Sequence, residues 1–449
     1  MLKLITKQYF AFLISLGFKV IFNYNIIFVV QRFLGLLLIL LLVNNISKDS
    51  YGLFVYFISV QYFIVELSHL GLPLMIIKKI ASNKIVGGNK VYSIIVFSFL
   101  FSFFLSVLLF FIGNNFFFKF PISFLSLSAL ITLTTLNYIF VAVFTSIKKA
   151  NFAYFSDSVL KIIIIILWAT FYLLPNNLLD FQSIIYTYIA ANIFVFLVFI
   201  LFFYKDFILK LTFKKFEFEF KEYFYSIFFL GLSSIILLFN TRIDIFMIDY
   251  FLGKQQVASY YIATQLSFIP YMAMLSLYTI LSSVITRNIN KEKYSLIFIS
   301  MVFYRSFVFL AILLISIFYY FYLEDLILIF FNPLYLDAYN PAMVLCILYL
   351  AATPFIFSDL ILKLSGNEKK VMYYAATSAI LNISLNYFFI IRYGIVGASY
   401  ATGISMLMMH FLCFLSLNKK NFFLFLLIKF FLSKKKYQIN YIVKKFFKA

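Results

Sequence analysis

Residues 240–265 read NTRIDIFMIDYFLGKQQVASYYIATQ, and the rest of the chain is interpreted from this stretch. Arg242, Asp244 and Asp249 stand at the end of a long apolar run, where charges inside a bilayer are costly and usually face a cavity or a partner. The seven-residue spacing places Arg242 and Asp249 on one helix face and Asp244 roughly opposite. A Gly-Lys break at 253–254 precedes a second long apolar helix. The pattern predicts two membrane helices joined by a tight turn.

The composition excludes a soluble domain of this length. Of 449 residues, 65% are hydrophobic and 22% aromatic, and the mean hydropathy is +1.03. Apolar runs of membrane-spanning length recur along the chain without the alternation typical of a β-barrel. We therefore expect an all-α polytopic membrane protein with about twelve transmembrane helices. Cys346 and Cys413 fall inside predicted spans, which indicates packing and not a disulfide or a metal site, and no cofactor motif is present.

The predicted spans fall into two sets of six separated by a basic linker. They cover residues 20–43, 51–77, 92–112, 122–147, 152–174, 183–204, 223–251, 256–285, 294–321, 341–364, 372–391 and 395–417. This predicts an N-terminal six-helix bundle over 1–210, a C-terminal bundle over 211–420 and a basic cytoplasmic or interfacial tail over 421–449. An even number of spans per half gives both halves the same orientation in the membrane.

The distribution of basic residues predicts the orientation. Of the 37 Lys and Arg residues, 29 fall on the side of the two termini and 4 on the opposite side. This asymmetry places both termini in the cytoplasm. The net charge of +21 is then mostly topogenic, so we do not expect nucleic acid as a partner.

Four basic residues lie within the predicted spans and are the candidate substrate-binding residues: Arg32, Lys161, Arg242 and Arg305. Arg32 has only apolar residues and glycine at its i±3 and i±4 positions, so it needs a wet cavity, a distant acid or a bound anion. A guanidinium matches the oxygens of a diphosphate well. A structural ion pair remains the alternative for Arg32.

Five acids are candidates for ion coupling or for lining a cavity: Glu66, Asp157, Asp244, Asp249 and Asp359. Each also has a structural interpretation. Asp157 is four residues from Lys161 and could neutralise it, and Asp359 stands in the same relation to Lys363. Glu66 and His69 share a face and could either titrate together or form a helix-interface hydrogen bond.

Other polar residues of the spans have simpler expectations. His410 is isolated in the sequence and is predicted to be a core residue, while Asn382 and Asn386 share a helix face and are expected to hydrogen-bond across helices. Pro270 and Pro354 lie inside spans, where each would produce either a gating bend or a static kink.

Three stretches resemble the polysaccharide-exporter branch of the multidrug/oligosaccharidyl-lipid/polysaccharide superfamily, and most closely the O-antigen flippases of the Wzx type. They are DIFMIDYFLGKQQVASYYIA at 244–263, GNEKKVMYYAATSAILNISLNYFFIIRYGIVGASYATG at 366–403 and, more weakly, SYGLFVYFIS at 50–59 with LSHLGLPLMIIKKIA at 67–81. The chain departs from the family pattern at Ile391-Arg392, where Ile-Pro is common.

The resemblance implies a MATE-like fold of two six-helix bundles and a transport function. The implied activity is alternating-access translocation of an undecaprenyl-diphosphate-linked oligosaccharide, such as an O-antigen unit, across the bacterial inner membrane. The implied partners are this glycan, membrane lipids and a coupling proton or sodium ion. A drug/cation antiporter of the same fold is the alternative, although four intramembrane bases favour an anionic substrate.

An enzymatic role is the rival from a different class. Polysaccharide polymerases and ligases are expected to carry a sizeable outer loop with basic residues. The longest outer loop here, residues 322–340, contains no Lys or Arg. We therefore expect a transporter and not an enzyme.

Overall fold

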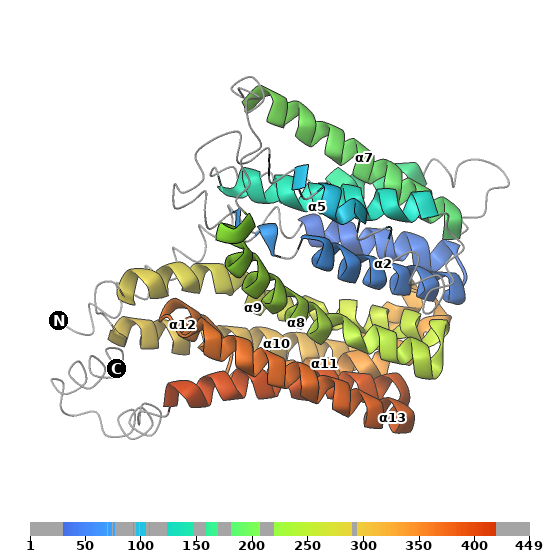
Figure 1. Ribbon diagram of the computed structural model, residues 1–449. Coiled ribbons are helices and arrows are strands. Elements are labelled where there is room, and N and C mark those ends of the chain that lie inside the picture. The colour runs from blue at the N-terminus through green and yellow to red at the C-terminus, as the bar shows by residue number, and fades with distance from the viewer. Residues whose placement is uncertain are drawn as a thin grey trace, which may run out of the picture. The chain divides into compact units, whose positions relative to one another are not determined.

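The computed structural model describes residues 30–69, 71–73, 75–76, 93, 96–97, 99–104, 107, 124–146, 159–168, 181–206, 220–289 and 294–418. These residues are almost entirely helical, with no strand among them (Figure 1). The long helices are α2 (Lys48–His69), α5 (Phe124–Ser146), α7 (Phe181–Asp206), α8 (Phe220–Leu252), α9 (Lys254–Ile289), α10 (Tyr294–Phe330), α11 (Tyr339–Ala352) and α13 (Glu368–Asn418). Shorter elements are η2 (Pro333–Ala338), α12 (Ser358–Leu364) and apolar helices at Val30–Asn45 and Val159–Trp168.

The all-α membrane architecture expected from the sequence is confirmed. Within the described ranges, 6 helices are long and apolar enough to cross a membrane. The helices α8 and α9 in addition cover the whole of the predicted spans at 223–251 and 256–285. The predicted basic tail lies outside the described residues, as does much of the predicted spans at 92–112 and 152–174.

The chain forms two compact units. The first unit contains Ile27–Ile245 and Gly253–Ala258, and the described part of the second contains Phe246–Leu252 and residues 259–418. The division therefore passes through α8 and α9, on either side of the Gly253 turn. The predicted boundary between residues 210 and 211 falls outside the described residues and stays a prediction.

The first unit is held together by apolar clusters and by buried amide and hydroxyl pairs. Phe57 of α2 packs edge-on against Phe181 of α7, with Leu130 and Ile185 in the same cluster. Bonds between helices join Gln61 to Thr134 (3.0 Å), Asn137 to Asn192 (3.3 Å) and Trp168 to Thr187 (2.8 Å). Burying these groups is tolerated because each of these donors has an acceptor.

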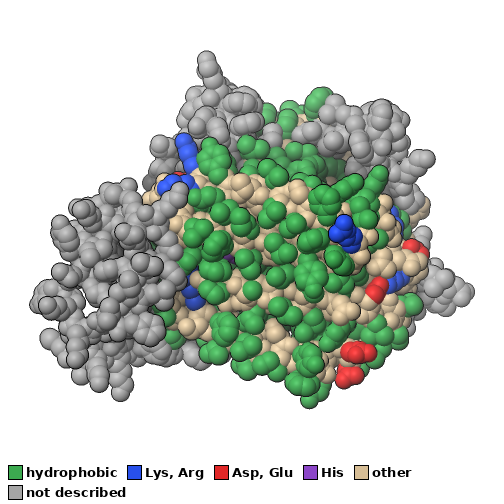
Figure 2. Space-filling model, turned by 90° about the horizontal axis from the view of Figure 1, so that it is seen from below, with side chains coloured by type: hydrophobic (Ala, Val, Ile, Leu, Met, Phe, Trp, Pro, Cys, Tyr) green, Lys and Arg blue, Asp and Glu red, His purple; other side chains and the backbone are tan. Residues whose placement is uncertain are grey.

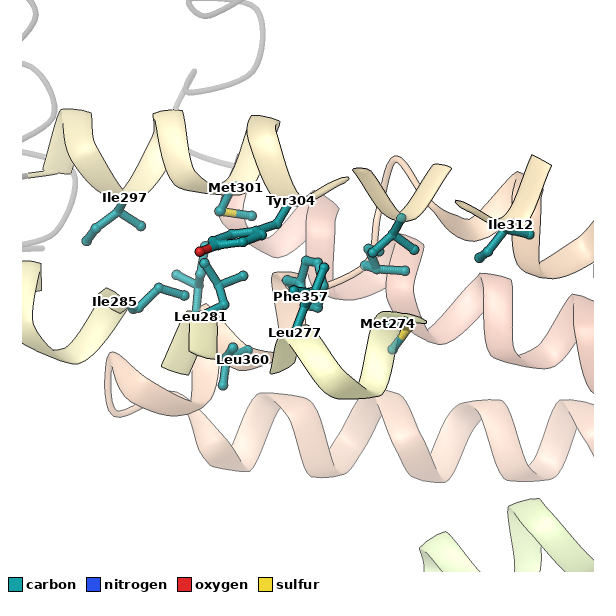
Figure 3. Close-up of a cluster of buried hydrophobic side chains, with 13 residues drawn as sticks. Met274, Leu277, Leu281, Ile285, Ile297, Met301, Tyr304, Ile312, Phe357 and Leu360 are labelled. Carbon is teal, nitrogen blue, oxygen red and sulfur yellow. The ribbon is translucent and has the colours of Figure 1, made fainter. Parts of the chain in front are cut away.

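In the second unit, α9 and α10 pack around the junction between α11 and α12. Figure 3 shows Leu277 and Leu281 of α9 and Met301 of α10 converging on Phe357. Phe357 is fully buried and adopts a left-handed conformation with φ 64°, which is rare for a bulky residue. The apolar cluster thus holds an interruption of the helical backbone at residues 353–357, where Pro354 lies.

The helix α13 is a hairpin of two arms. Gly394 at its bend has φ 60° and ψ −142°, a backbone conformation open essentially to glycine. The arms are bonded from Ser378 to the carbonyl of Ser405 (2.7 Å) and from Asn382 to the hydroxyl of Ser405 (3.1 Å), and Asn386 bonds Asn382 (2.9 Å). The expected hydrogen bonding of the two asparagines across helices is confirmed for Asn382.

The outer surface suits a lipid environment. In Figure 2, hydrophobic side chains cover most of the visible face and the charged side chains lie toward its edges. The helix α10 contributes exposed apolar residues along its length, including Leu310, Leu314, Ile317 and Phe321. A large exposed apolar surface marks a membrane interaction site.

Candidate functional site

The turn between α8 and α9 contacts α2 within the first unit. Gly253 has φ 86°, a conformation that glycine tolerates, and it lets α9 begin directly after α8. The carbonyl of Lys254 approaches Gly52 so closely that a β-carbon there would overlap it. Gln255 donates to Asp49 (2.8 Å), and the Lys254 ammonium lies 3.5 Å from the centre of the Tyr56 ring. Within the stretch at 240–265, the residues that follow Gly253 therefore bring the start of α9 into close contact with α2.

One predicted substrate-binding cation of the first unit, Lys161, contacts the helix that carries another, Arg32. The Lys161 ammonium donates to the backbone carbonyl of Gln31 at 3.3 Å and lies against Gly35. Arg32 is the next residue after Gln31 and its side chain is exposed. Lys161 is half-buried, and its amine is held by this helix. Asp157, its predicted neighbour, lies outside the described residues.

A second charged group of this unit lies where α2 meets α8. The Arg242 guanidinium lies over the Tyr62 ring at 5.2 Å, a cation–π distance. One turn further along α2, Glu66 faces His69 at 3.4 Å and also hydrogen-bonds Ser234 of α8. Glu66 is 23% exposed and His69 6%. The predicted shared face of Glu66 and His69 is confirmed, and Glu66 does make a hydrogen bond to another helix. A coupling role stays a prediction.

Asp244 and Asp249 of α8 differ in burial, as expected from their predicted places on different faces of the helix. Asp244 is 3% exposed, whereas Arg242 and Asp249 are half-buried. A carboxylate as buried as Asp244 requires partners. Its predicted place on the face opposite Arg242 agrees with this difference. Asp249 belongs to the second unit and Asp244 to the first.

Arg305 anchors the backbone interruption of the second unit. Its Nε and one terminal nitrogen both donate to the carbonyl of Ile356, at 2.9 and 2.8 Å, and the same terminal nitrogen donates to the Ser358 hydroxyl at 2.9 Å. The guanidinium also lies 5.8 Å from the centre of the Phe414 ring. Much of the hydrogen-bonding capacity of the Arg305 guanidinium is thus used on atoms of the protein itself. Its predicted contact with substrate stays a prediction.

Asp359 is the centre of a buried polar cluster directly after this interruption. Its Oδ2 atom accepts from the Tyr278 hydroxyl at 2.8 Å and from the Lys363 ammonium at 3.1 Å. Its Oδ1 atom faces Nδ1 of His410 at 3.9 Å. The predicted ion pair between Asp359 and Lys363 is confirmed. The prediction that His410 is a core residue is confirmed, and α13 brings its ring to the carboxylate.

Apart from Lys363, the sequence did not identify the partners of Asp359 in this cluster. Tyr278, Asp359 and His410 come from α9, α12 and α13, and nothing in their local pattern links them. The one available signal was the rarity of a histidine inside a predicted span. Within the described ranges, no group of three or more His, Cys, Asp or Glu side chains could hold a metal ion.

Comparison with known proteins supports the fold. The family model described as MatE matches residues 230–388, which include the charged end of α8, all of α9, Asp359 with Lys363, and most of the first arm of α13, but not His410. No curated protein matches the chain. The match covers the stretch at 244–263 that carries the resemblance and only part of the one at 366–403.

Solved structures of membrane transporters align over most of the chain. The lipid II flippase MurJ, in an inward closed conformation, aligns with a TM-score of 0.68 at 18% identity, covering 94% of this chain and 97% of that one. An inward-facing multidrug resistance MATE family transporter of the MOP superfamily gives 0.67 at 16% identity, covering 86% and 93%. A MOP superfamily transporter from Pyrococcus furiosus gives 0.56 at 16%, covering 90% and 93%.

These findings define what the chain shares with known proteins. The MatE family model matches part of the chain, and the chain has the fold of solved MATE transporters. Identities below 20% show the fold and do not identify the transported molecule.

Proposed function

We propose that this chain is a flippase that moves an undecaprenyl-diphosphate-linked oligosaccharide, such as an O-antigen unit, across the bacterial inner membrane. The observation that carries the proposal is the placement of Lys161 beside Gln31, next to Arg32. The helices that carry Arg32 and Lys161 are distant in the sequence and touch within the first unit. A diphosphate supplies both the charge and the oxygen acceptors that such a pair requires.

The first unit offers further support. Arg242 lies over Tyr62 and is half-buried, so a cation and an aromatic face are available together for an anionic headgroup and its sugar. The likeness to a lipid II flippase supports a lipid-linked substrate. The exposed apolar face of α10 is compatible with a prenyl tail that remains in lipid while the polar head is moved.

The proposed mechanism is alternating access. The basic residues of the first unit bind the diphosphate on the cytoplasmic side, and a change of conformation exposes it to the other side. The chain performs no covalent chemistry in this scheme. Both termini are proposed to be cytoplasmic because 29 of 37 basic residues fall on their side.

Arg32 gives the sharpest test of the headgroup contact. Arg32→Ala is expected to abolish flipping of the lipid-linked glycan in proteoliposomes, and Arg32→Lys to retain part of it, because the charge survives without the planar fork. The matched control is Arg392→Ala, since Arg392 is an exposed arginine at the α13 bend. Normal flipping by Arg32→Ala would exclude Arg32 from the site. Rescue of Arg32→Ala by a second change, Asp244→Asn, would instead assign it to a structural ion pair.

A drug/cation antiporter is the second candidate, favoured by the likeness to multidrug resistance transporters. The same proteoliposomes distinguish the two when they are loaded with a fluorescent organic cation in place of the glycan. Cation export that survives Arg32→Ala, with no glycan flipping by the unaltered chain, would replace the flippase proposal.

A further inference from the structure

The helix α9 contains Pro270, and the carbonyl group that this proline leaves without an amide partner is bound by another helix. Pro270 has no N–H group, so the carbonyl of Leu266 cannot accept the usual hydrogen bond from the residue four positions further along. The Tyr319 hydroxyl of α10 donates to this carbonyl at 3.0 Å, and the bond is buried. A side chain of α10 thus replaces the missing amide of α9.

The turn of α9 before Pro270 is weakened further by two of its own hydroxyl groups. The Thr264 hydroxyl donates to the carbonyl of Tyr261 at 2.7 Å, and the Ser267 hydroxyl donates to the carbonyl of Thr264 at 3.0 Å. Such side-chain bonds compete with the helical backbone bonds and often bend a helix. A proline directly after two such hydroxyls makes residues 264–270 a place where α9 can bend.

The parts of α9 on either side of Pro270 pack against different helices of the second unit. Before the proline, the Tyr260 hydroxyl lies 3.1 Å from the hydroxyl of Thr402 in the second arm of α13. After the proline, from Met274 onward, α9 enters the apolar cluster that it forms with α10 and the junction of α11 and α12 (Figure 3). A change of the bend at Pro270 therefore moves one set of contacts relative to the other.

The hydrogen bond from Tyr319 differs in kind from the helical bond that it replaces. A backbone bond within a helix is fixed by the conformation of its own segment, whereas the bond from Tyr319 joins two helices. A single neutral hydrogen bond contributes little net stability, because water competes for both of its partners when it opens. The bond from Tyr319 to Leu266 can therefore open without unwinding α9.

The same helix also donates to the backbone interruption at residues 353–357. Arg305 of α10 donates to the carbonyl of Ile356, and it precedes Tyr319 by 14 residues, which is about four turns of the helix. Four turns return a side chain to nearly the same face, so both donors lie on one side of α10. One continuous helix thus binds the irregular backbone of two of its neighbours.

We infer that Tyr319 is a positioning residue that holds α9 in its bend at Pro270, and that opening of this one hydrogen bond lets the bend change. Pro270 is then a gating bend and not a static kink. The inference goes beyond the proposed function, because it holds for a flippase and for an antiporter alike.

Hydrogen exchange of the backbone amides measures this opening directly. The full-length protein is reconstituted in nanodiscs, and exchange is followed by mass spectrometry of peptides that cover residues 262–274. Tyr319→Phe removes only the hydroxyl group, and we expect it to raise the exchange rate of this segment about two- to tenfold, as the loss of one neutral hydrogen bond predicts. Peptides of α2 and α5 should exchange at unchanged rates.

A second variant, Pro270→Ala, separates a role at the bend from a general stabilising role of the hydroxyl. Alanine restores the amide at residue 270, so the carbonyl of Leu266 regains its helical partner and no longer depends on Tyr319. We expect residues 262–274 to exchange more slowly in Pro270→Ala, and the further change Tyr319→Phe to have no effect there. An equal increase in exchange with and without the proline would overturn the inference.

The matched control is Tyr320→Phe, since Tyr320 is the next residue along α10 and is 66% exposed, whereas Tyr319 is 3% exposed. This control should leave the exchange of residues 262–274 unchanged. Should Pro270→Ala fail to fold, the two tyrosine variants still decide, because equal exchange rates in both would overturn the inference. No substrate is used, so failure here is distinct from failure of the flippase proposal.

Discussion

Replacing Arg305 tests whether the interrupted helix is held by this one side chain. Arg305 makes three hydrogen bonds, two to the Ile356 carbonyl and one to Ser358. Arg305→Ala leaves a backbone carbonyl without its partner beside the fully buried Phe357. A hydrogen bond from a charged donor contributes about 1.5–3 kcal/mol, and two of the three share one acceptor, so we expect a loss of about 3–5 kcal/mol. Arg305→Lys should lose less, because one ammonium can still reach the carbonyl.

The assay is thermal unfolding of the purified protein in detergent, followed by the reactivity of its two buried cysteines toward a thiol dye. A loss of this size should lower Tm by several degrees, since large domains shift by about 2–4 °C per kcal/mol. Arg392→Ala provides the matched loss of an exposed arginine and should leave Tm unchanged. An unchanged Tm in Arg305→Ala together with lost transport would refute the anchoring argument and support direct contact with substrate.

The remaining predictions concern topology, one acid and one close helix contact. A reporter fused after Lys215 should read cytoplasmic and one after Asn177 periplasmic; reversed readings would overturn the span count or the orientation. Asp244→Asn should impair transport at unchanged protein level, whereas unaltered transport would leave the buried carboxylate a packing role. Gly52→Ala should destabilise the protein by about 1–3 kcal/mol, because its β-carbon would overlap a backbone carbonyl of α9, while Gly35→Ala should be tolerated at a 3.7 Å contact.

The contact between α2 and α9 could be predicted from the sequence only in part. The polar break at residues 253–254 was predicted, and Gly253 does provide the turn. The packing of this turn against Gly52 was not predicted. Gly52 is one of thirteen glycines, and its sequence context does not distinguish it from the others. Close approach of two backbones depends on which helices are neighbours, and that is a property of the packed chain.

In the candidate site, too, contacts within one helix could be predicted from the sequence and contacts between helices could not. The Glu66–His69 contact and the Asp359–Lys363 ion pair were predictable because residues three or four apart on a helix are neighbours. The approach of His410 to Asp359 was not, since it joins positions 51 residues apart on different helices. Similarly, the spacing of Lys161 and Arg32 in the sequence gives no sign that their helices touch.

The sequence alone determined that this is a helical multi-pass membrane protein and which of its residues are costly to place in a bilayer. Hydropathy and helical periodicity are local, so they can be read without knowing any contact. Only the tertiary structure decided what each costly residue does. It assigned Arg305 to a backbone carbonyl, Asp359 to a four-residue cluster and Lys161 to the neighbourhood of Arg32, because a charge inside a membrane protein must find its partner on another helix.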